Sequence, residues 1–168
     1  MNKNLKRCLE QSINREFVSV YHDYDMRETI YSIPYNASLA PRSVKLILIR
    51  AMGLDADEDF DYEDPRDIDS AAMRLIDGTT PAFVLASSHF INKNGTLMTH
   101  YTLDFDGEVL FERAYNSEKL NKKNPILHLM RKCSDKVISQ ERAAQEHKME
   151  KMFISTNMFT SYAQHGRK

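Results

Sequence analysis

Residues 82–115 read AFVLASSHFINKNGTLMTHYTLDFDGEVLFERAY, and this stretch decides the fold. Three runs rich in apolar and β-branched residues, 82–91, 96–105 and 108–115, are separated by the dipeptides Asn94-Gly95 and Asp106-Gly107. Asn-Gly and Asp-Gly accept the positive φ angles that tight hairpin turns require. The stretch therefore predicts a three-strand antiparallel meander.

The segments outside the meander predict a second hairpin and several helices. Residues 17–21 and 29–33 have the alternation of strands, with a polar turn between them. Apolar residues recur at close to helical spacing in 3–14, 41–53, 67–78 and from Pro125 onward. Strands flanked by separate helices are typical of an α+β fold. We expect an antiparallel sheet packed with helices, a long C-terminal helix, a single domain over 1–152, and a tail at 153–168 that is docked or disordered.

Composition sets the broad class. The chain has 168 residues, of which 42% are hydrophobic and 28% charged, with five glycines and five prolines. These values exclude a collagen, a low-complexity linker and a disulfide scaffold. Cys8 and Cys133 form no CxxC motif, which favours a reducing cytoplasm. No apolar run approaches the roughly 18 residues of a membrane span, and the charged N-terminus is unlike a signal peptide. We expect a soluble cytoplasmic protein without a membrane partner.

Charge is segregated along the chain, although the formal net charge is only −1. Residues 1–54 carry a net charge of +3, residues 55–78 carry −8, residues 79–116 carry −2, and residues 117–168 carry +6. Opposite blocks of this size can attract each other within the fold or face separate partners.

The meander predicts a polar face. If Asn94-Gly95 and Asp106-Gly107 are both two-residue loops, His89 and Arg113 lie opposite His100 on the neighbouring strands, and a four-residue first loop leaves the faces unchanged. One face then carries Ser87, His89, His100, Thr102, Asp104 and Arg113. The other face, expected to be the core side, carries Val84, Phe90, Tyr101, Leu103, Phe105 and Leu110.

Two readings of this polar face are open. Two imidazoles and the Asp104 carboxylate could bind a metal, or act as acid and base while Arg113 holds an anion. Alternatively, the face is a solvated sheet surface, which antiparallel sheets commonly present. We favour the second reading, because strand periodicity without a helical HExxH spacing is a weak metal signal. No metal and no cofactor are expected.

Cys8 offers another catalytic arrangement. A cysteine near a helix start, paired with a strand-borne histidine such as His100, is the working unit of Cys–His hydrolases. Cys8 also falls on the apolar stripe of its helix, where cysteine usually acts as a small hydrophobe. A Cys–His or His/Asp-dependent hydrolase or transferase is therefore kept as an alternative function.

The acidic segment suggests a binding role without a metal. Asp57, Asp59 and Asp61 lie in it at alternate positions. An EF-hand register that begins at Asp55 places Phe60 where glycine is needed and Arg66 where glutamate is needed, which excludes an EF-hand. We expect an acidic loop that contacts a basic partner or the chain's own C-terminal part.

The C-terminal part is basic and rich in methionine and aromatic residues. Lys122, Lys123, Arg131 and Lys132 could contact phosphates, which makes a nucleic-acid-associated protein a second alternative. Acidic residues dilute this patch, and no helix-turn-helix, zinc finger or RNP motif is present. An adaptable docking surface could form from Met149, Met152, Phe153, Met158 and Phe159.

These patterns favour a small regulatory or interaction protein over an enzyme. Its partner would be another macromolecule, with another protein expected first. Such a short, glycine-poor, methionine-rich chain would suit an accessory protein of a phage or mobile element. The sequence does not specify the oligomeric state.

Overall fold

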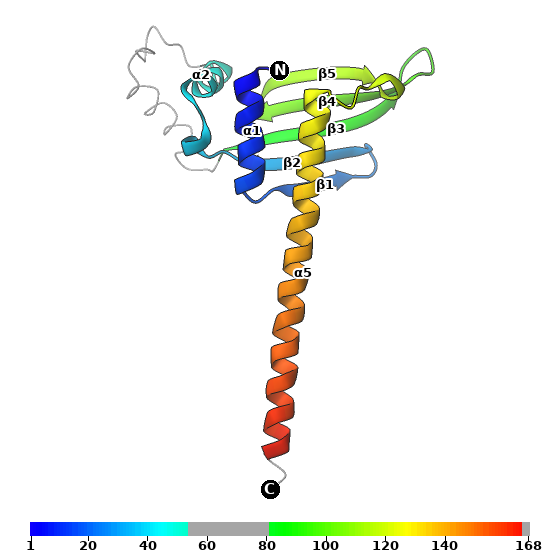
Figure 1. Cartoon of the computed structure of the whole chain (residues 1–168). Helices are drawn as coiled ribbons and strands as arrows, with labels where there is room; N and C mark the ends of the chain where they lie inside the picture. The colour runs from blue at the N-terminus through cyan, green and yellow to red at the C-terminus, as the bar shows by residue number, and fades with distance from the viewer. Residues whose placement is uncertain (54–80, 166–168) are drawn as a thin grey trace.

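The centre of the molecule is a five-stranded antiparallel sheet whose strands follow chain order (Figure 1). A computed structural model describes residues 1–53 and 81–165, with side chains through residue 156. The first hairpin pairs β1 (Ser19–Asp23) with β2 (Glu28–Pro34). The meander of β3 (Ala82–Ile91), β4 (Leu97–Phe105) and β5 (Glu108–Asn116) joins it through β2 and β3. The predicted α+β class, hairpin and meander are confirmed.

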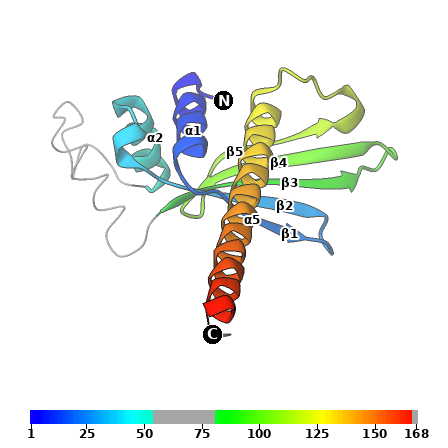
Figure 2. The same ribbon diagram turned by 60° about the horizontal axis from the view of Figure 1, so that its bottom comes forward.

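Helices cover one face of this sheet. Figure 2 shows α1 (Lys3–Arg15) and the first part of α5 (Pro125–His165) on the same side of the strands, with α2 (Arg42–Ala51) next to α1. Two short 3₁₀ turns, η1 (Ala37–Leu39) and η2 (Ser117–Lys119), lie in the connections. Residues 153–165, which we expected to form a docked or disordered tail, instead continue α5 as helix. The helix predicted at 67–78 lies outside the described residues.

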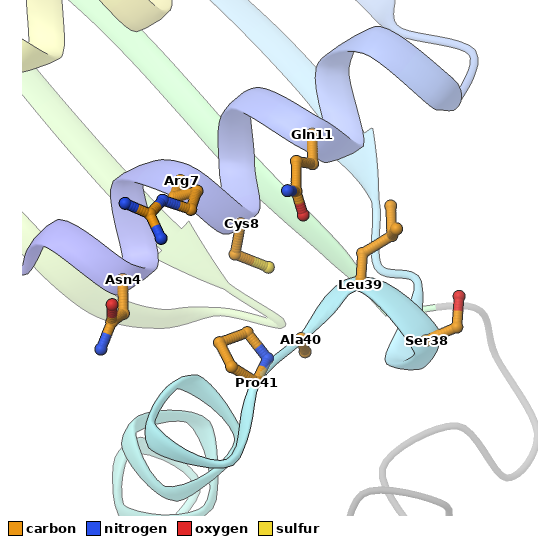
Figure 3. A pocket seen from close by; sticks show the side chains of 8 residues that line it. All are labelled: Asn4, Arg7, Cys8, Gln11, Ser38, Leu39, Ala40 and Pro41. Atoms are coloured by element: carbon orange, nitrogen blue, oxygen red, sulfur yellow. The ribbon is translucent and has the colours of Figure 1, made fainter.

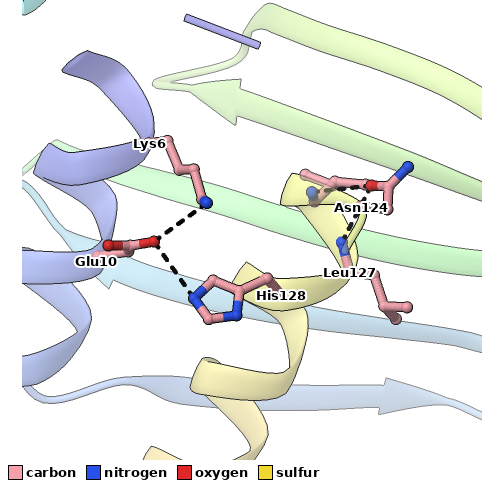
Figure 4. Close-up of polar contacts among 6 residues, drawn as sticks. Lys6, Glu10, Asn124, Leu127 and His128 are labelled. Atoms are coloured by element: carbon pink, nitrogen blue, oxygen red, sulfur yellow. Dashed lines mark hydrogen bonds and ion pairs between the residues drawn. The ribbon is translucent and has the colours of Figure 1, made fainter. Parts of the chain in front are cut away.

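Asparagine caps set the start of both long helices. The Asn2 side chain accepts hydrogen bonds from the backbone N–H groups of Asn4 and Leu5, at 2.8 and 3.2 Å. Asn124 accepts a bond from the N–H of Ile126 at 3.0 Å (Figure 4). Pro125 follows as the first helical residue, where its missing N–H costs nothing. The sequence signal at Asn124-Pro125 therefore predicted this boundary correctly.

The hydrophobic core lies between the sheet and its helical layer. α1 buries the stripe of Leu5, Cys8, Leu9, Ser12 and Ile13, with apolar residues at helical spacing. The sheet contributes Ile33, Phe83, Leu85, Leu103 and Phe105, and α5 contributes Ile126, Leu129 and Cys133, all of them essentially inaccessible to solvent. At the surface of this layer, Glu10 Oε1 lies 3.6 Å from Lys6 Nζ and 3.4 Å from His128 Nε2 (Figure 4). Exposed ion pairs contribute little, so apolar packing accounts for most of the α1–α5 association.

The first meander loop differs from the one we predicted, and the difference reverses the face of one strand. Asn92 N–H donates to Thr96 C=O at 3.0 Å, which leaves a three-residue loop of Lys93, Asn94 and Gly95. Within it only Gly95 has a positive φ, of 77°. A type I turn followed by one left-handed residue gives this loop length. Because an odd loop shifts the pairing by one residue, His89 pairs with Thr99 and His100 with Ser88.

A bulge between β4 and β5 adds a second shift. The Asp106-Gly107 loop has two residues as predicted, and both have positive φ, of 48° and 87°. Leu103 nevertheless pairs with Phe111 and Asp104 with Val109, which leaves Leu110 as an extra residue. Beyond the bulge, Arg113 therefore pairs with Tyr101 rather than with His100.

The shift at the first loop reverses the predicted core side of β3. Phe83 and Leu85 are the buried residues of this strand on the helix-covered side, whereas Phe90 is 44% exposed on the open face. Tyr101, Leu103 and Phe105 are buried as predicted.

Candidate functional site

The predicted polar constellation is divided between the two faces of the sheet. Directly paired residues share a face, so the register leaves His100, Thr102 and Asp104 on the open face. Ser87, His89 and Arg113 lie on the helix-covered side, where Ser87 and Arg113 both pair with Tyr101. The prediction that both imidazoles and Arg113 project from one side is therefore wrong.

On the open face, His100 is paired with a carboxylate. Its Nε2 lies 2.9 Å from Oε1 of Glu112. Burial, with a smaller contribution from the negative charge of Glu112, raises the pKa of Asp104 above its usual value. The Oδ1 atom of Asp104 is buried and accepts no hydrogen bond from the described residues. Asp104 therefore has one desolvated carboxylate oxygen close to the negative charge of Glu112.

On the helix-covered side, His89 belongs to a chain of hydroxyl contacts. Its Nδ1 lies 3.1 Å from Oγ1 of the buried Thr99, which lies 2.7 Å from Oγ of Ser117. Arg113 places its guanidinium carbon 5.1 Å from the centroid of the Tyr115 ring. These contacts satisfy His89 and Arg113 locally, and neither approaches His100.

The Cys8–His100 pair of the alternative hydrolase is not formed. Cys8 is 1% exposed on the side of α1 that belongs to the core, whereas His100 lies on the open face of the sheet. Burial raises the pKa of the Cys8 thiol, and it raises that of Cys133 to about 12. Both thiols are therefore poor nucleophiles at neutral pH. Among the residues that the structure describes, no three His, Cys, Asp or Glu side chains are grouped to hold a metal ion.

A cleft of about 350 Å³ opens between α1 and the η1 segment (Figure 3). Its lining residues are Asn4, Arg7, Cys8, Gln11, Ser38, Leu39, Ala40 and Pro41. None of these is a His, Asp or Glu that could take a proton from Cys8. Within the described part of its lining, the cleft therefore lacks the base that a thiol nucleophile needs.

The structure describes only some of the charged residues that the sequence predicted to contact a partner. Lys122 and Lys123 lie between η2 and α5, while Arg131 and Lys132 lie in the second turn of α5. Arg131 lies close enough to Tyr101 for its positive charge to influence that hydroxyl. Asp57, Asp59 and Asp61 lie outside the described residues. A phosphate-binding role for the basic residues stays a prediction.

The distal part of α5, after the groove beside β1, carries several exposed large apolar side chains. After about Gln140 the helix leaves the sheet and extends past β1 (Figure 1). Met149, Met152, Phe153 and Ile154 are 69%, 61%, 67% and 57% exposed. The sequence composition pointed to this segment as a docking surface, whereas its extension away from the body was not predicted.

Sequence reasoning missed a groove between β1 and α5. Phe17, Val18, Ser19 and Val20 form one wall, and Val137, Gln140, Glu141 and Ala144 form the other, around a volume of about 330 Å³. The Gln140 side chain closes one end, because its amide donates to Val18 C=O at 2.7 Å and accepts from Val18 N–H at 2.9 Å. No local pattern pairs residues 122 positions apart, so the sequence carried no signal for this groove.

Comparison of the chain with protein-family models, curated proteins and solved structures gives no match. In the described ranges, no helix combines the length and apolar character needed to cross a membrane.

Proposed function

We propose that this protein is a non-catalytic interaction protein that binds another protein through the free half of α5. The supporting observation is the exposure of Met149, Met152 and Phe153 on a helix that extends away from its own core. A helical segment gains most of its stability from packing an apolar face. Large exposed apolar patches on a protein usually mark an interaction site.

The position of these residues around the helix supports an external partner. At about 100° per residue, Met149, Met152 and Phe153 cluster within about 100° of one another around the axis. Of the residues buried earlier in α5, Leu129 and Cys133 lie about 150° or more from the centre of that cluster, and Met130 and Val137 lie about 90° to 110° from it. The cluster therefore does not continue the buried stripe of α5, and it requires a different surface to cover it.

The residue types suit a protein surface. Methionine side chains are flexible and polarisable, so they adapt to apolar partners. Glu146, Lys148, Glu150 and Lys151 surround the apolar residues with both signs of charge. A stretch of mixed charge favours a protein over the uniformly negative backbone of a nucleic acid.

Affinity capture from an extract of the native host tests this proposal. The baits are the unaltered chain, a Met152→Gln/Phe153→Gln variant, and a Glu146→Gln/Glu150→Gln control in the same helical segment. We expect one or a few proteins to bind the unaltered chain and the control, and to be lost with the apolar variant. Capture that is the same with all three baits contradicts the proposal.

Sedimentation velocity of the purified chain separates a partner from a second copy. We expect a monomer, because the proposal assigns the apolar residues to a different protein. A dimer that dissociates in the Met152→Gln/Phe153→Gln variant would show that a second copy covers this surface, and the proposed separate partner would then be wrong.

A further inference from the structure

The edge of β1 is open to a further strand. β1 is the outermost strand of the five, with β2 as its only neighbour in the described sheet. Val18 directs its N–H and C=O toward Gln140 and away from β2. Because this direction alternates along an antiparallel strand, Val20 and His22 direct theirs to the same outer edge. No hydrogen bond to the backbone of Val20 or His22 on that edge is seen within the described ranges.

The opposite edge of the sheet carries features that discourage pairing. β5 contains the bulge at Leu110 and charged residues at Glu108, Glu112 and Arg113. Bulges and charges are the devices by which proteins protect edge strands. β1 has no bulge in its pairing with β2, no proline and no lysine, and its one acidic residue, Asp23, is the last residue of the strand. The two edges therefore differ in their capacity to accept a strand.

The groove beside β1 supplies a place for the side chains of an added strand. Val18 and Val20 of the edge face Val137 and Ala144 of α5 across it. Gln140 already makes with Val18 the pair of N–H and C=O bonds that a peptide backbone would make with Val20 and His22. The groove thus combines main-chain bonding groups with an apolar pocket, as in other cases of strand addition.

From this geometry we propose that an extended segment of a partner protein adds to β1 as a sixth strand and places apolar side chains in the groove between β1 and α5. This inference goes beyond the proposed function, because it adds a second binding site, at β1, to the exposed apolar residues of the distal part of α5. Among the described residues that line the groove, Glu141 is the only charged one, so a lysine or arginine beside the apolar residues of the segment would complement it. β1 contains neither residue. A second copy of β1 would therefore leave Glu141 without an opposite charge.

Phage-displayed random short peptides provide the probe, selected on the purified full chain. Selected peptides should share alternating β-branched or aromatic residues and a basic residue. Their affinity is then measured by fluorescence anisotropy against three single variants. Ala144→Trp fills the groove from an exposed helical position, and His22→Pro removes one outward N–H from an edge strand, where proline is tolerated. Ala143→Trp is the matched control, because Ala143 does not line the groove.

We expect Ala144→Trp and His22→Pro each to weaken peptide binding by about tenfold or more, while Ala143→Trp leaves it within about twofold. The circular dichroism spectrum and melting temperature of each variant check that it folds. Failure to select any peptide, or equal affinity for Ala144→Trp and Ala143→Trp, overturns the inference. Dimerisation of the pure chain that is abolished by Ala144→Trp overturns it as well, because a second copy would then occupy the edge.

The Met152→Gln/Phe153→Gln variant distinguishes this inference from the proposed function. Peptide binding in the groove should survive in that variant. A host protein that is lost with the Met152→Gln/Phe153→Gln bait but is still captured by Ala144→Trp would support the proposed function and exclude β1 as its binding site.

Discussion

At the scale of single residues, Asp104 is the side chain whose environment conflicts most with its charge. It pairs with Val84 on one side and with Val109 on the other, so apolar neighbours flank it on both strands. A carboxylate oxygen that is buried without a hydrogen-bond partner, as Oδ1 of Asp104 is, costs free energy, and the nearby Glu112 adds repulsion. This residue therefore lowers the stability of the folded state when it is ionised.

Replacing Asp104 with asparagine should stabilise the protein at neutral pH by roughly 0.5 kcal/mol, because it removes a partly buried charge whose cost the solvent screens. The folded-state pKa of Asp104 is raised, so the folded protein binds more protons than the unfolded chain between the ordinary carboxyl pKa and the raised one. The free energy of unfolding therefore falls as pH rises through that window. Urea unfolding at a series of pH values checks this, and the advantage of Asp104→Asn should shrink as pH falls below the window. An equal advantage at all pH values would contradict the assignment.

At the scale of elements, the sequence predicted which segments are strands and helices but not which residues face each other. Periodicity and caps identified α1, β1 to β5 and the start of α5, because those signals are local. The side of the sheet on which each residue of the next strand lies depends on whether the connecting loop has an odd or an even number of residues. Asn94-Gly95 suits a two-residue loop as well as the observed three-residue one, since Gly95 supplies the single positive φ. No dipeptide marks the bulge at Leu110, so the sequence could not predict which residues of β5 share a face with His100.

At the same scale, one side-chain contact links β1 to α5. Gln140 makes two hydrogen bonds to the backbone of Val18, at 2.7 and 2.9 Å. Both hydrogen bonds are partly buried, so losing them would leave the N–H and C=O of Val18 unsatisfied. Gln140 therefore fixes the start of β1 against the helix.

Gln140→Ala should lower the free energy of unfolding by about 1–2 kcal/mol, because Val18 loses both partners. Gln145→Ala is the matched control, since Gln145 is an exposed glutamine in the same helix, and it should change stability by less than about 0.5 kcal/mol. Hydrogen exchange should show faster exchange at the Val18 amide in Gln140→Ala alone. Equal stability of the two variants would show that the amide of Gln140 does not hold β1.

At the scale of the whole molecule, α5 has two parts with different roles. The first part, with Ile126, Leu129 and Cys133, is integral to the core cluster that spans α1 and the sheet. The second part, from residue 141 through residue 156, is exposed at every position. The described core is therefore complete without residues 141–156, as expected if this segment is the proposed surface for a partner.

A chain that ends after Gln145 should consequently unfold with a free energy within about 0.5 kcal/mol of the full chain, because it keeps Gln140, Glu141 and every residue of α5 that is buried among those described. In the full chain, amide exchange should be slow over residues 126–140 and fast beyond residue 146, since an isolated helix is only marginally stable in water. Urea unfolding of both chains and hydrogen exchange followed by mass spectrometry provide the two measurements. A loss of 2 kcal/mol or more on truncation would mean that the distal helix packs on the body, and its methionine and phenylalanine side chains would then be core residues rather than a surface for a partner.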